Sequence, residues 1–191
     1  MKLIENLDGY YLVGVGSVVL KVSTTNTAEV QTISTEKSGD SHVVTLTVSK
    51  ETGHLFVGYS NKVVASFSLN TLELVGSIVL RKQPTAIQYS SFLASAVDRA
   101  SADPSKVHHV LLASDKAGEV FAINAPLLEK QVLLAGHTAS VITDLAIHAS
   151  AKAHYVATSD RDEKIRISHF PDMENIHTFL LGHTKVVASV N

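Results

Sequence analysis

The chain contains no cysteine, and the residues that most suggest a metal site are its ten histidines. None of them shows a recognised ligand spacing such as His-Glu-x-x-His. His108 and His109 are neighbours on an expected strand, where adjacent side chains point to opposite faces of a sheet. We therefore predict surface or core histidines and no metal site.

Motifs for cofactor binding or nucleophilic catalysis are missing as well. Gly14-Val15-Gly16 has no third glycine at the required place and no helix after it, so it predicts a turn and not a dinucleotide site. The sequence also lacks the Gly-x-Ser-x-Gly motif of a serine nucleophile. These observations favour a binding module over an enzyme, and a hydrolase has no supporting set of residues.

The elements expected along the chain are short strands, since apolar runs of four to eight residues alternate with turn residues. The most complete unit has strands expected at 42–48, 54–59, 62–69 and 72–80. Residues 90–106 are rich in Ser, Ala and Asp and predict a surface loop, with a helical turn over 92–100 as an alternative. The predicted units cover residues 9–34, 42–80, 84–135 and 137–181, and a further one starts at 184–191.

Composition agrees with one packed domain. The chain has 191 residues, of which 45% are hydrophobic and 18% charged, and it has no long apolar run of the kind that crosses a bilayer. Its start lacks the apolar region of a signal peptide, so we expect a soluble intracellular protein. The net charge is −2 and the 16 basic residues are spread thinly. Any contact with RNA should therefore be auxiliary to a basic partner.

A repeated motif narrows the fold class. Gly136-His137 and Gly182-His183 each begin a unit, and an Asp stands in a tight turn near the end of the unit between them. This pattern resembles the WD repeat, in which each unit supplies one four-stranded blade of a β-propeller. The resemblance implies an all-β, partial WD40-type β-propeller, with about four blades and one strand of an expected seven. We expect the chain to be part of a longer protein.

The charged segment Asp160-Arg161-Asp162-Glu163-Lys164-Ile165-Arg166, followed by Ile167-Ser168, is more specific. It resembles the WD-repeat non-catalytic subunit of tRNA (guanine-N7)-methyltransferase. Two shorter segments, 81–86 and 115–121, are also similar to that family; the second matches its Asp-Lys-x-Gly-Asp-Val-Tyr with two mild changes. The resemblance covers nearly the whole chain and about the first half of the family's length.

The resemblance implies a subunit without a catalytic site or cofactor of its own. Its partner would be the catalytic methyltransferase subunit, which binds S-adenosylmethionine, and the two would form a heterodimer. The propeller would hold that partner in an active conformation and help align tRNA, so that 7-methylguanosine forms in the variable loop. The expected location is the nucleus, without membrane contact. The alternative is a generic WD-repeat scaffold of another complex.

The family also implies roles for particular residues. Strand alternation places Ile165 and Ile167 inward and Lys164 and Arg166 outward, so the expected interface with the catalytic subunit is Asp160, Arg161, Glu163, Lys164 and Arg166. The alternative is a solvated hairpin with weak surface ion pairs. The candidates for contact with tRNA or the partner are Arg81, Lys82 and Lys116. The expected structural network joins His137, Thr158 and Asp162, with Ser168 in place of the usual Trp, and His183 begins the next unit.

Overall fold

The computed structural model describes residues 4–25, 29–33, 40–93, 107–137, 140–149 and 154–190. Every regular element within these ranges is a β-strand. The described residues hold no helix that is long and apolar enough to cross a membrane. The all-β fold class predicted from the sequence is therefore confirmed.

Within these ranges, sixteen strands form four antiparallel sheets of four strands each, and every sheet uses four strands that are consecutive in the sequence. Sheet 1 contains β1 (Ile4–Leu7), β2 (Tyr10–Val15), β3 (Val18–Ser23) and β4 (Val30–Ile33). Sheet 2 contains β5 (Val43–Ser49), β6 (His54–Tyr59), β7 (Val63–Ser68) and β8 (Leu74–Val79). Sheet 3 contains β9 (Pro84–Leu93), β10 (Val107–Asp115), β11 (Glu119–Asn124) and β12 (Gln131–Gly136). Sheet 4 contains β13 (Ile142–Ala149), β14 (His154–Asp160), β15 (Ile165–His169) and β16 (Ile176–Leu180).

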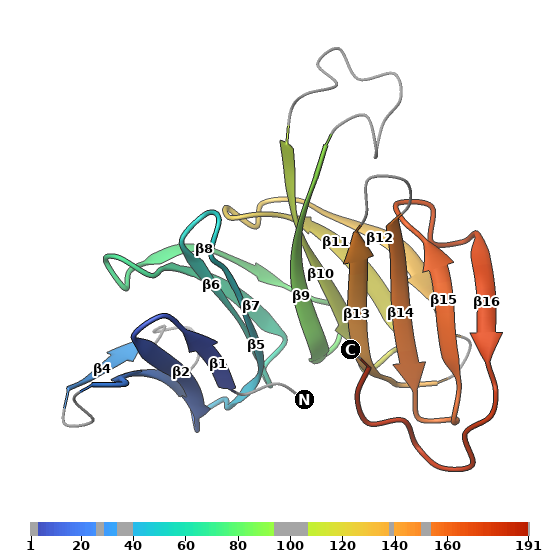
Figure 1. The fold of residues 1–191 in the computed structure, drawn as a ribbon, viewed down its shortest axis with the longest axis horizontal. Helices are drawn as coiled ribbons and strands as arrows, with labels where there is room; N and C mark the ends of the chain where they lie inside the picture. The colour runs from blue at the N-terminus through green and yellow to red at the C-terminus, as the bar shows by residue number, and fades with distance from the viewer. Residues whose placement is uncertain are drawn as a thin grey trace.

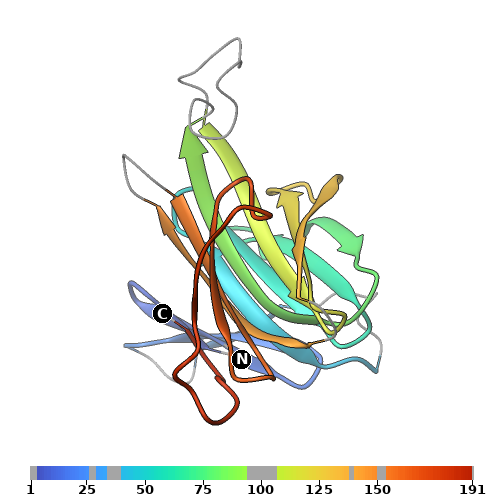
Figure 2. The same ribbon diagram turned by 90° about the vertical axis from the view of Figure 1, so that its right-hand side faces the viewer.

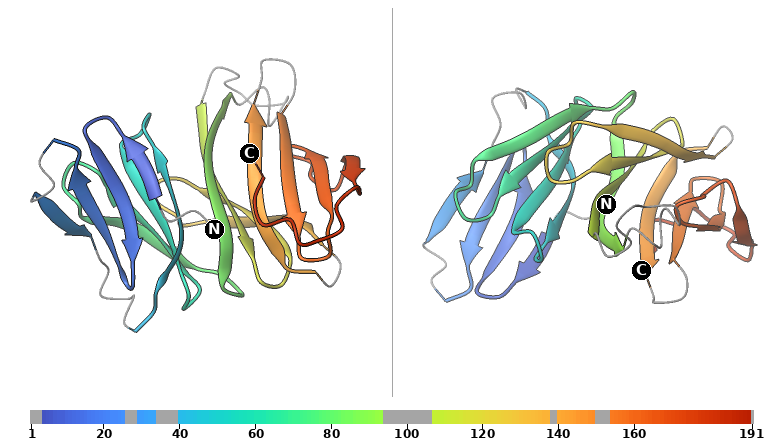
Figure 3. Two further views of the ribbon diagram at one scale, coloured as in Figure 1. Left: turned by 60° about the horizontal axis from the view of Figure 1, so that its bottom comes forward. Right: turned by 90° about the horizontal axis from the view of Figure 1, so that it is seen from above.

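The four sheets stand side by side in a half ring, with sheet 1 at one end and sheet 4 at the other (Figure 1; Figure 3). The first strand of each sheet lies on the inner side of the arc, where β5 contacts β9 and β9 contacts β13. The fourth strands, such as β8 and β16, lie on the outside. This radial arrangement of antiparallel sheets is that of propeller blades.

The core consists of three apolar layers, one between each pair of neighbouring sheets. Leu12 and Val19 of sheet 1 pack with Leu46 of sheet 2. Equivalent layers lie between sheets 2 and 3 and between sheets 3 and 4. Adjacent residues of β6, such as Phe56 and Val57, are both fully buried, because sheet 2 has a neighbour on each side. The middle sheets therefore need apolar residues on both faces of their strands.

Two segments differ from the sequence prediction. β1 was missed, because its four residues include the polar Glu5 and Asn6 and give a weak strand signal. β9 continues to Leu93, where a loop or helical turn was expected, because Ser90 pairs with Val110 and Phe92 packs on Phe170 with ring centroids 4.4 Å apart. The remainder of that predicted loop, residues 94–106, lies outside the described residues.

The segment after sheet 4 is not a strand, although one was expected to begin at Lys185. Figure 2 looks at the side of the molecule on which sheet 4 lies, and residues 181–190 pass in front of that sheet in this view. Three separate hydrogen bonds hold them to β13. Thr143 Oγ1 donates to the carbonyl of Val187, while Ser189 Oγ and the backbone N–H of Val190 donate to Asp144 Oδ2. These hydrogen bonds use the side chains of Thr143 and Asp144 in β13 and not the backbone of that strand.

The contact between sheets 2 and 3 yields the first prediction. A Cβ atom at Gly76 in β8 would overlap the backbone carbonyl of Leu127, whereas one at Gly182 would meet no atom within 4 Å. Gly76→Ala should therefore lower the free energy of unfolding by about 1 to 3 kcal/mol, as overpacking does. Gly182→Ala is the matched control and should change it by less than about 0.5 kcal/mol. Equal urea midpoints for the two variants would show that this close contact is absent.

Candidate protein-interaction site

The charged segment found in the sequence forms the tight hairpin between β14 and β15. Asp160 Oδ1 accepts the backbone N–H groups of Asp162 and Lys164, at 2.9 and 3.0 Å. Glu163 has a φ of 70° and takes the turn position that glycine favours. The hairpin of sheet 3 is built in the same way, since Asp115 Oδ1 accepts two backbone N–H groups and Gly118 has a φ of 86°. An Asp side chain thus fixes each turn from inside.

His137 connects this hairpin to the preceding loop. Its Nδ1 donates to Asp160 Oδ2 at 3.0 Å, and its Nε2 lies 2.7 Å from Thr158 Oγ1. The His137 and Asp160 side chains are only 6% and 3% exposed. The predicted pairing with Asp162 is wrong: the Asp162 side chain is 48% exposed and lies 3.9 Å from Arg161 Nε. Asp160 is the last residue of β14 and points inward, whereas Asp162 lies in the turn itself.

The environment of Asp160 favours its charged form. Burial acts to raise the pKa of its carboxyl, but the hydrogen bond and charge of His137 and the backbone N–H groups of Lys164 and Asp162 outweigh burial and hold the pKa below its usual value. Asp160 is thus a buried carboxylate whose oxygens are hydrogen-bonded. Its position gives it a structural role and does not expose it to a partner, contrary to the expectation from the family.

Arg166 is also buried, with 8% of its surface exposed, although strand alternation predicted an outward side chain. Its Nε donates to Ser168 Oγ at 2.9 Å, its NH1 donates to the carbonyl of Gly136 at 3.2 Å, and its NH2 donates to the carbonyl of Met173. Burial lowers the pKa of Arg166, and the charge of Glu174 opposes that effect. Sheet 4 therefore uses an Arg and Ser pair where a generic repeat carries Trp.

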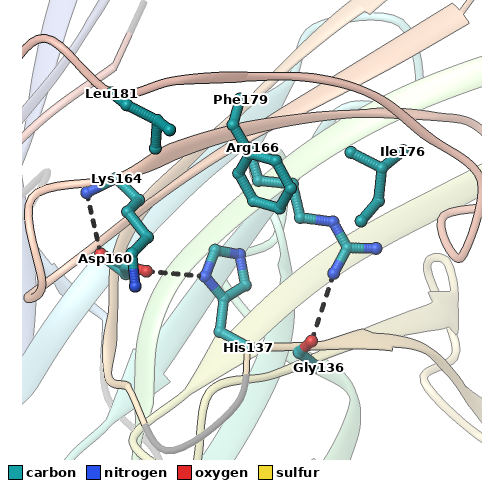
Figure 4. Close-up of a pocket in the computed structure, with 8 residues that line it drawn as sticks. All are labelled: Gly136, His137, Asp160, Lys164, Arg166, Ile176, Phe179 and Leu181. Carbon is teal, nitrogen blue, oxygen red and sulfur yellow. Dashed lines mark hydrogen bonds and ion pairs between the residues drawn. The ribbon is translucent and has the colours of Figure 1, made fainter.

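A cavity of about 410 Å³ opens beside this network (Figure 4). One wall carries His137, Asp160, Lys164 and Arg166, and the opposite wall is apolar. Lys164 lies at the rim and is exposed. The combination of an apolar wall with buried and rim charges suits a partner side chain that has both an apolar stem and a polar end. The apolar wall is made of Ile176, Phe179 and Leu181.

Neighbouring turns and loops join the hairpin on one end of the half ring, which we call the hairpin end. The N–H of Leu80 donates to the carbonyl of Lys62, and the N–H of Lys116 donates to that of Gln83. The N–H groups of His137 and Arg161 in turn donate to the carbonyls of Gly118 and Val141. These bonds tie the turns of three successive sheets together. The hairpin end therefore consists of the described residues 60–62, 80–83, 115–119, 136–137, 140–141 and 160–164.

This end gathers basic side chains that are scattered in the sequence. Six of its residues are exposed bases, and Arg81 NH1 lies 3.3 Å from Glu119 Oε1. The acidic Asp162 and Glu163 are also exposed there, so the surface is mixed in charge with an excess of bases. The fold thus brings the Arg81 and Lys82 pair and Lys116 to the same end as the charged hairpin. The six bases are Lys62, Arg81, Lys82, Lys116, Arg161 and Lys164.

The other histidines show no metal arrangement. In the described ranges, no three His, Asp or Glu side chains are placed to hold a metal ion. His183 is exposed, and no hydrogen bond of its ring is seen among the residues described. Sequence reasoning missed one cluster on the outer face of sheet 4. The ring centroids of Tyr155, His169 and His177 lie 5.0 to 5.2 Å from one another. Its members come from three strands, so no local spacing reveals it.

The fold and the His-Asp network define the WD-repeat β-propeller class. The structure matches the crystal structure of the Mitotic Checkpoint Complex with a TM-score of 0.75, at 16% identity, over 100% of this chain and 52% of that chain. It matches the Cps50 (Swd1) β-propeller domain of Myceliophteria thermophila with a TM-score of 0.72, at 11% identity, over 96% and 55% of the two chains. These similarities establish the fold alone.

The sequence comparisons point to one family within that class. The family described as the tRNA methyltransferase TRM82 WD40 domain matches residues 124–191. The tRNA (guanine-N(7)-)-methyltransferase non-catalytic subunit TRM82 of Eremothecium gossypii is 40% identical over 42% of this chain and 18% of that protein. The subunit of the same name from Meyerozyma guilliermondii is 30% identical over 78% of this chain and 34% of that protein. The resemblance to this family is confirmed for part of the chain, and the chain spans 18% and 34% of the length of these two relatives.

Exchange of Asp160 tests its place in the network. Asp160→Asn removes the charge that accepts the His137 and backbone hydrogen bonds, so it should lower the free energy of unfolding by about 1 to 3 kcal/mol. Asp162→Asn, two residues away and exposed, should change it by less than about 0.5 kcal/mol. Urea unfolding followed by circular dichroism measures both. A larger loss of stability for Asp162→Asn than for Asp160→Asn would show that Asp162 belongs to the network.

The lowered pKa of Asp160 also predicts a pH dependence. Its pKa is lower in the folded than in the unfolded chain, so the carboxylate stabilises the fold above the ordinary value of about 3.9. That contribution disappears as the pH falls through the folded pKa. Between pH 7 and pH 3, the wild type should therefore lose more stability than Asp160→Asn. Parallel pH profiles of the two proteins would contradict the assignment.

Arg166 provides a third test. Arg166→Leu leaves the Gly136 and Met173 carbonyls and the Ser168 hydroxyl without their donor, so we expect a loss of about 2 to 4 kcal/mol in the free energy of unfolding. Arg161→Leu removes an exposed side chain of the same type and is the matched control, with an expected change below about 0.5 kcal/mol. Thermal melts of the two variants distinguish them. An unchanged melt for Arg166→Leu would mean that its guanidinium faces solvent.

Proposed function

We propose that this chain supplies part of the propeller of a non-catalytic subunit of tRNA (guanine-N7)-methyltransferase. The observation that carries the proposal is the position of the family match, since residues 124–191 contain the hairpin, the buried network and the cavity. The names of the relatives support it, because each describes a non-catalytic subunit of that enzyme. In this role the chain binds the catalytic subunit and performs no chemistry itself.

The contact we propose for the catalytic subunit is the exposed part of the hairpin. Arg161, Glu163 and Lys164 project from a turn whose backbone Asp160 fixes. A preorganised turn loses little conformational entropy on binding, and charges of both signs set the orientation of the partner. Arg166 and Asp160 act from beneath: they hold the hairpin and line the adjoining cavity, and they do not form the outer contact surface.

An auxiliary contact with tRNA is part of the same proposal. The bases of the hairpin end lie on three successive sheets, and Lys116 and Lys82 are among those not seen in an ion pair within the described part of the chain. Such a surface attracts a phosphate backbone without reading its sequence. The net charge of −2 limits the strength of this contact, so the catalytic subunit would provide most of the binding to tRNA.

The rest of the assignment comes from the family resemblance. The catalytic subunit would bind S-adenosylmethionine, and the propeller would form a heterodimer with it, stabilise it and orient it toward the guanine of the variable loop. The complex would act in the nucleus. The competing proposal is a WD-repeat scaffold of another assembly, which the fold alone would equally support.

Lys164 gives the direct test. In titrations against the purified catalytic subunit, Lys164→Glu should weaken binding at least about tenfold, because it reverses a charge in the proposed contact. Formation of 7-methylguanosine in tRNA, measured by nucleoside mass spectrometry, should fall in parallel at limiting propeller concentration.

Lys130→Glu is the matched control, since Lys130 is an exposed lysine at the opposite end of sheet 3. It should bind and support methylation as the wild type does. If the wild-type chain does not bind the catalytic subunit at micromolar concentration, the family assignment fails. If it binds but Lys164→Glu binds equally well, the subunit assignment stands and the hairpin contact fails.

A further inference from the structure

The turns between the second and third strands of sheets 2, 3 and 4 share one backbone form. In each turn, the third residue after the end of the second strand has a positive φ, which is 76° at Lys62, 86° at Gly118 and 70° at Glu163. The carbonyl groups of Lys62 and Gly118 each accept a backbone N–H from the chain that leads to the next sheet. The three residues therefore occupy equivalent places, and this backbone role requires no side chain.

Glycine is the residue that such a place favours, because a Cβ atom makes the left-handed backbone costly. Hairpins with a turn of this kind usually carry glycine at the left-handed position. At Gly118 a Cβ atom would in addition lie 2.3 Å from the carbonyl oxygen of Ser140. Sheet 2 carries Lys62 instead, although its turn has the same backbone form. The lysine is therefore present at a cost to the stability of this turn.

Lys62 and Glu163 differ from the two other described residues that combine a side chain with a positive φ. Packing explains those two, since Leu128 lies in the core between sheets 2 and 3 and Leu72 packs on the core between sheets 1 and 2. Lys62 is exposed, and no ion pair or hydrogen bond of its ammonium group is seen among the described residues. Nothing in the described fold offsets the cost of this lysine, which is the pattern of a residue retained for binding.

The hydrogen bonds of the turns place Lys62 among bases. The N–H of Leu80 donates to the carbonyl of Lys62, so the lysine adjoins the segment that carries Arg81 and Lys82. A second bond joins the N–H of Lys116 to the end of that segment. Sheets 2 and 3 thus bring bases from three segments to one part of the hairpin end, residues 60–62, 80–83 and 115–119, which we call the basic part. Its exposed charged residues are Lys62, Arg81, Lys82 and Lys116.

The basic part differs from the hairpin of sheet 4 in its exposed charge. Its two acidic residues do not cancel the bases at the surface, because Asp115 is fully buried and Glu119 is partly buried beside Arg81. Residues 161–164 of the sheet 4 hairpin expose two acids and two bases. A surface of one sign suits a polyanion such as an RNA backbone, whereas a surface of both signs suits a protein. Lysine is a point charge that commonly binds phosphate.

We propose that Lys62 is a contact for an RNA phosphate and that the hairpin end is divided between two partners. The basic part holds the RNA backbone, and the hairpin of sheet 4 holds the catalytic subunit. This assignment rests on the proposed function and deepens it, because it gives a phosphate contact to a residue of sheet 2 that no motif in the sequence marks. It also explains why the turn of sheet 2 lacks glycine.

Lys62→Gly tests the assignment, because this variant should stabilise the fold and weaken the binding of RNA at the same time. Its urea midpoint should be higher than that of the wild type, since glycine relieves the left-handed backbone. In fluorescence anisotropy with a labelled tRNA transcript, its affinity should fall at least about threefold. The slope of the logarithm of the association constant against the logarithm of salt concentration should become shallower by about 0.7 to 0.9, the effect of one lost phosphate contact.

Two further variants serve as controls. Lys62→Arg keeps the charge and should keep the wild-type salt slope. Lys130→Gly removes an exposed lysine at the opposite end of sheet 3, where the backbone is not left-handed. It should bind the tRNA transcript with the wild-type slope and should not raise the urea midpoint. A lower urea midpoint for Lys62→Gly, or a salt slope equal to that of the wild type, would overturn the assignment.

The titrations are made with the chain alone at low salt and again with the chain and the catalytic subunit together. If the chain does not bind the catalytic subunit, the proposed function fails, while the titrations of the chain alone still decide the role of Lys62. If the subunit binds and Lys62→Gly leaves the salt slope unchanged, the proposed function stands and the phosphate contact fails. Weaker binding of the catalytic subunit by Lys62→Gly with an unchanged salt slope would show that Lys62 contacts protein, and would overturn the division.

Discussion

Coverage of each sheet on both faces is the constraint on which this structure depends. A four-stranded sheet with apolar residues on both sides is stable only where neighbours exclude water from both. Sheets 2 and 3 meet this condition within the chain, and Phe56 and Val57 show the result, since adjacent residues of one strand are both fully buried. The repeat of hairpin-connected strands therefore needs a neighbour on both sides of each blade, as a ring provides.

The same burial explains why the polar network is needed. His137, Asp160 and Arg166 lie where sheet 4 meets the loop before it, and each finds partners because an unpaired polar group in this place would cost about 1 to 3 kcal/mol. Their bonds connect the loop, the hairpin and the turn at Met173. The exposed residues of the hairpin are therefore held by groups that never reach the surface. The position of the exposed hairpin residues and the stability of the sheet therefore depend on the same hydrogen bonds.

Much of the fold could be predicted from the sequence, because strands are local patterns. The bounds of β6 agree with the expected residues 54–59, and those of β5, β7 and β8 differ from the expected bounds by at most two residues. The network was harder to predict. Asp160 and Asp162 are equally good turn residues, and only the inward direction of β14 selects the first. The burial of Arg166 depends on the carbonyls of Gly136 and Met173, which alternation along β15 does not reveal.

The distribution of charge on the surface could not be predicted from local sequence patterns either. The composition gives a net charge of −2 and no basic cluster longer than two residues. Lys62, Arg81, Lys116 and Arg161 lie at one end of the half ring, because the corresponding hairpin turn of each of these sheets is found there. Backbone hydrogen bonds join these turns to the segments that connect the sheets. A surface of one character can thus arise from residues that are far apart in the chain. A propeller can present such a surface across several blades, which explains how a protein with a net charge of −2 can carry a local excess of bases.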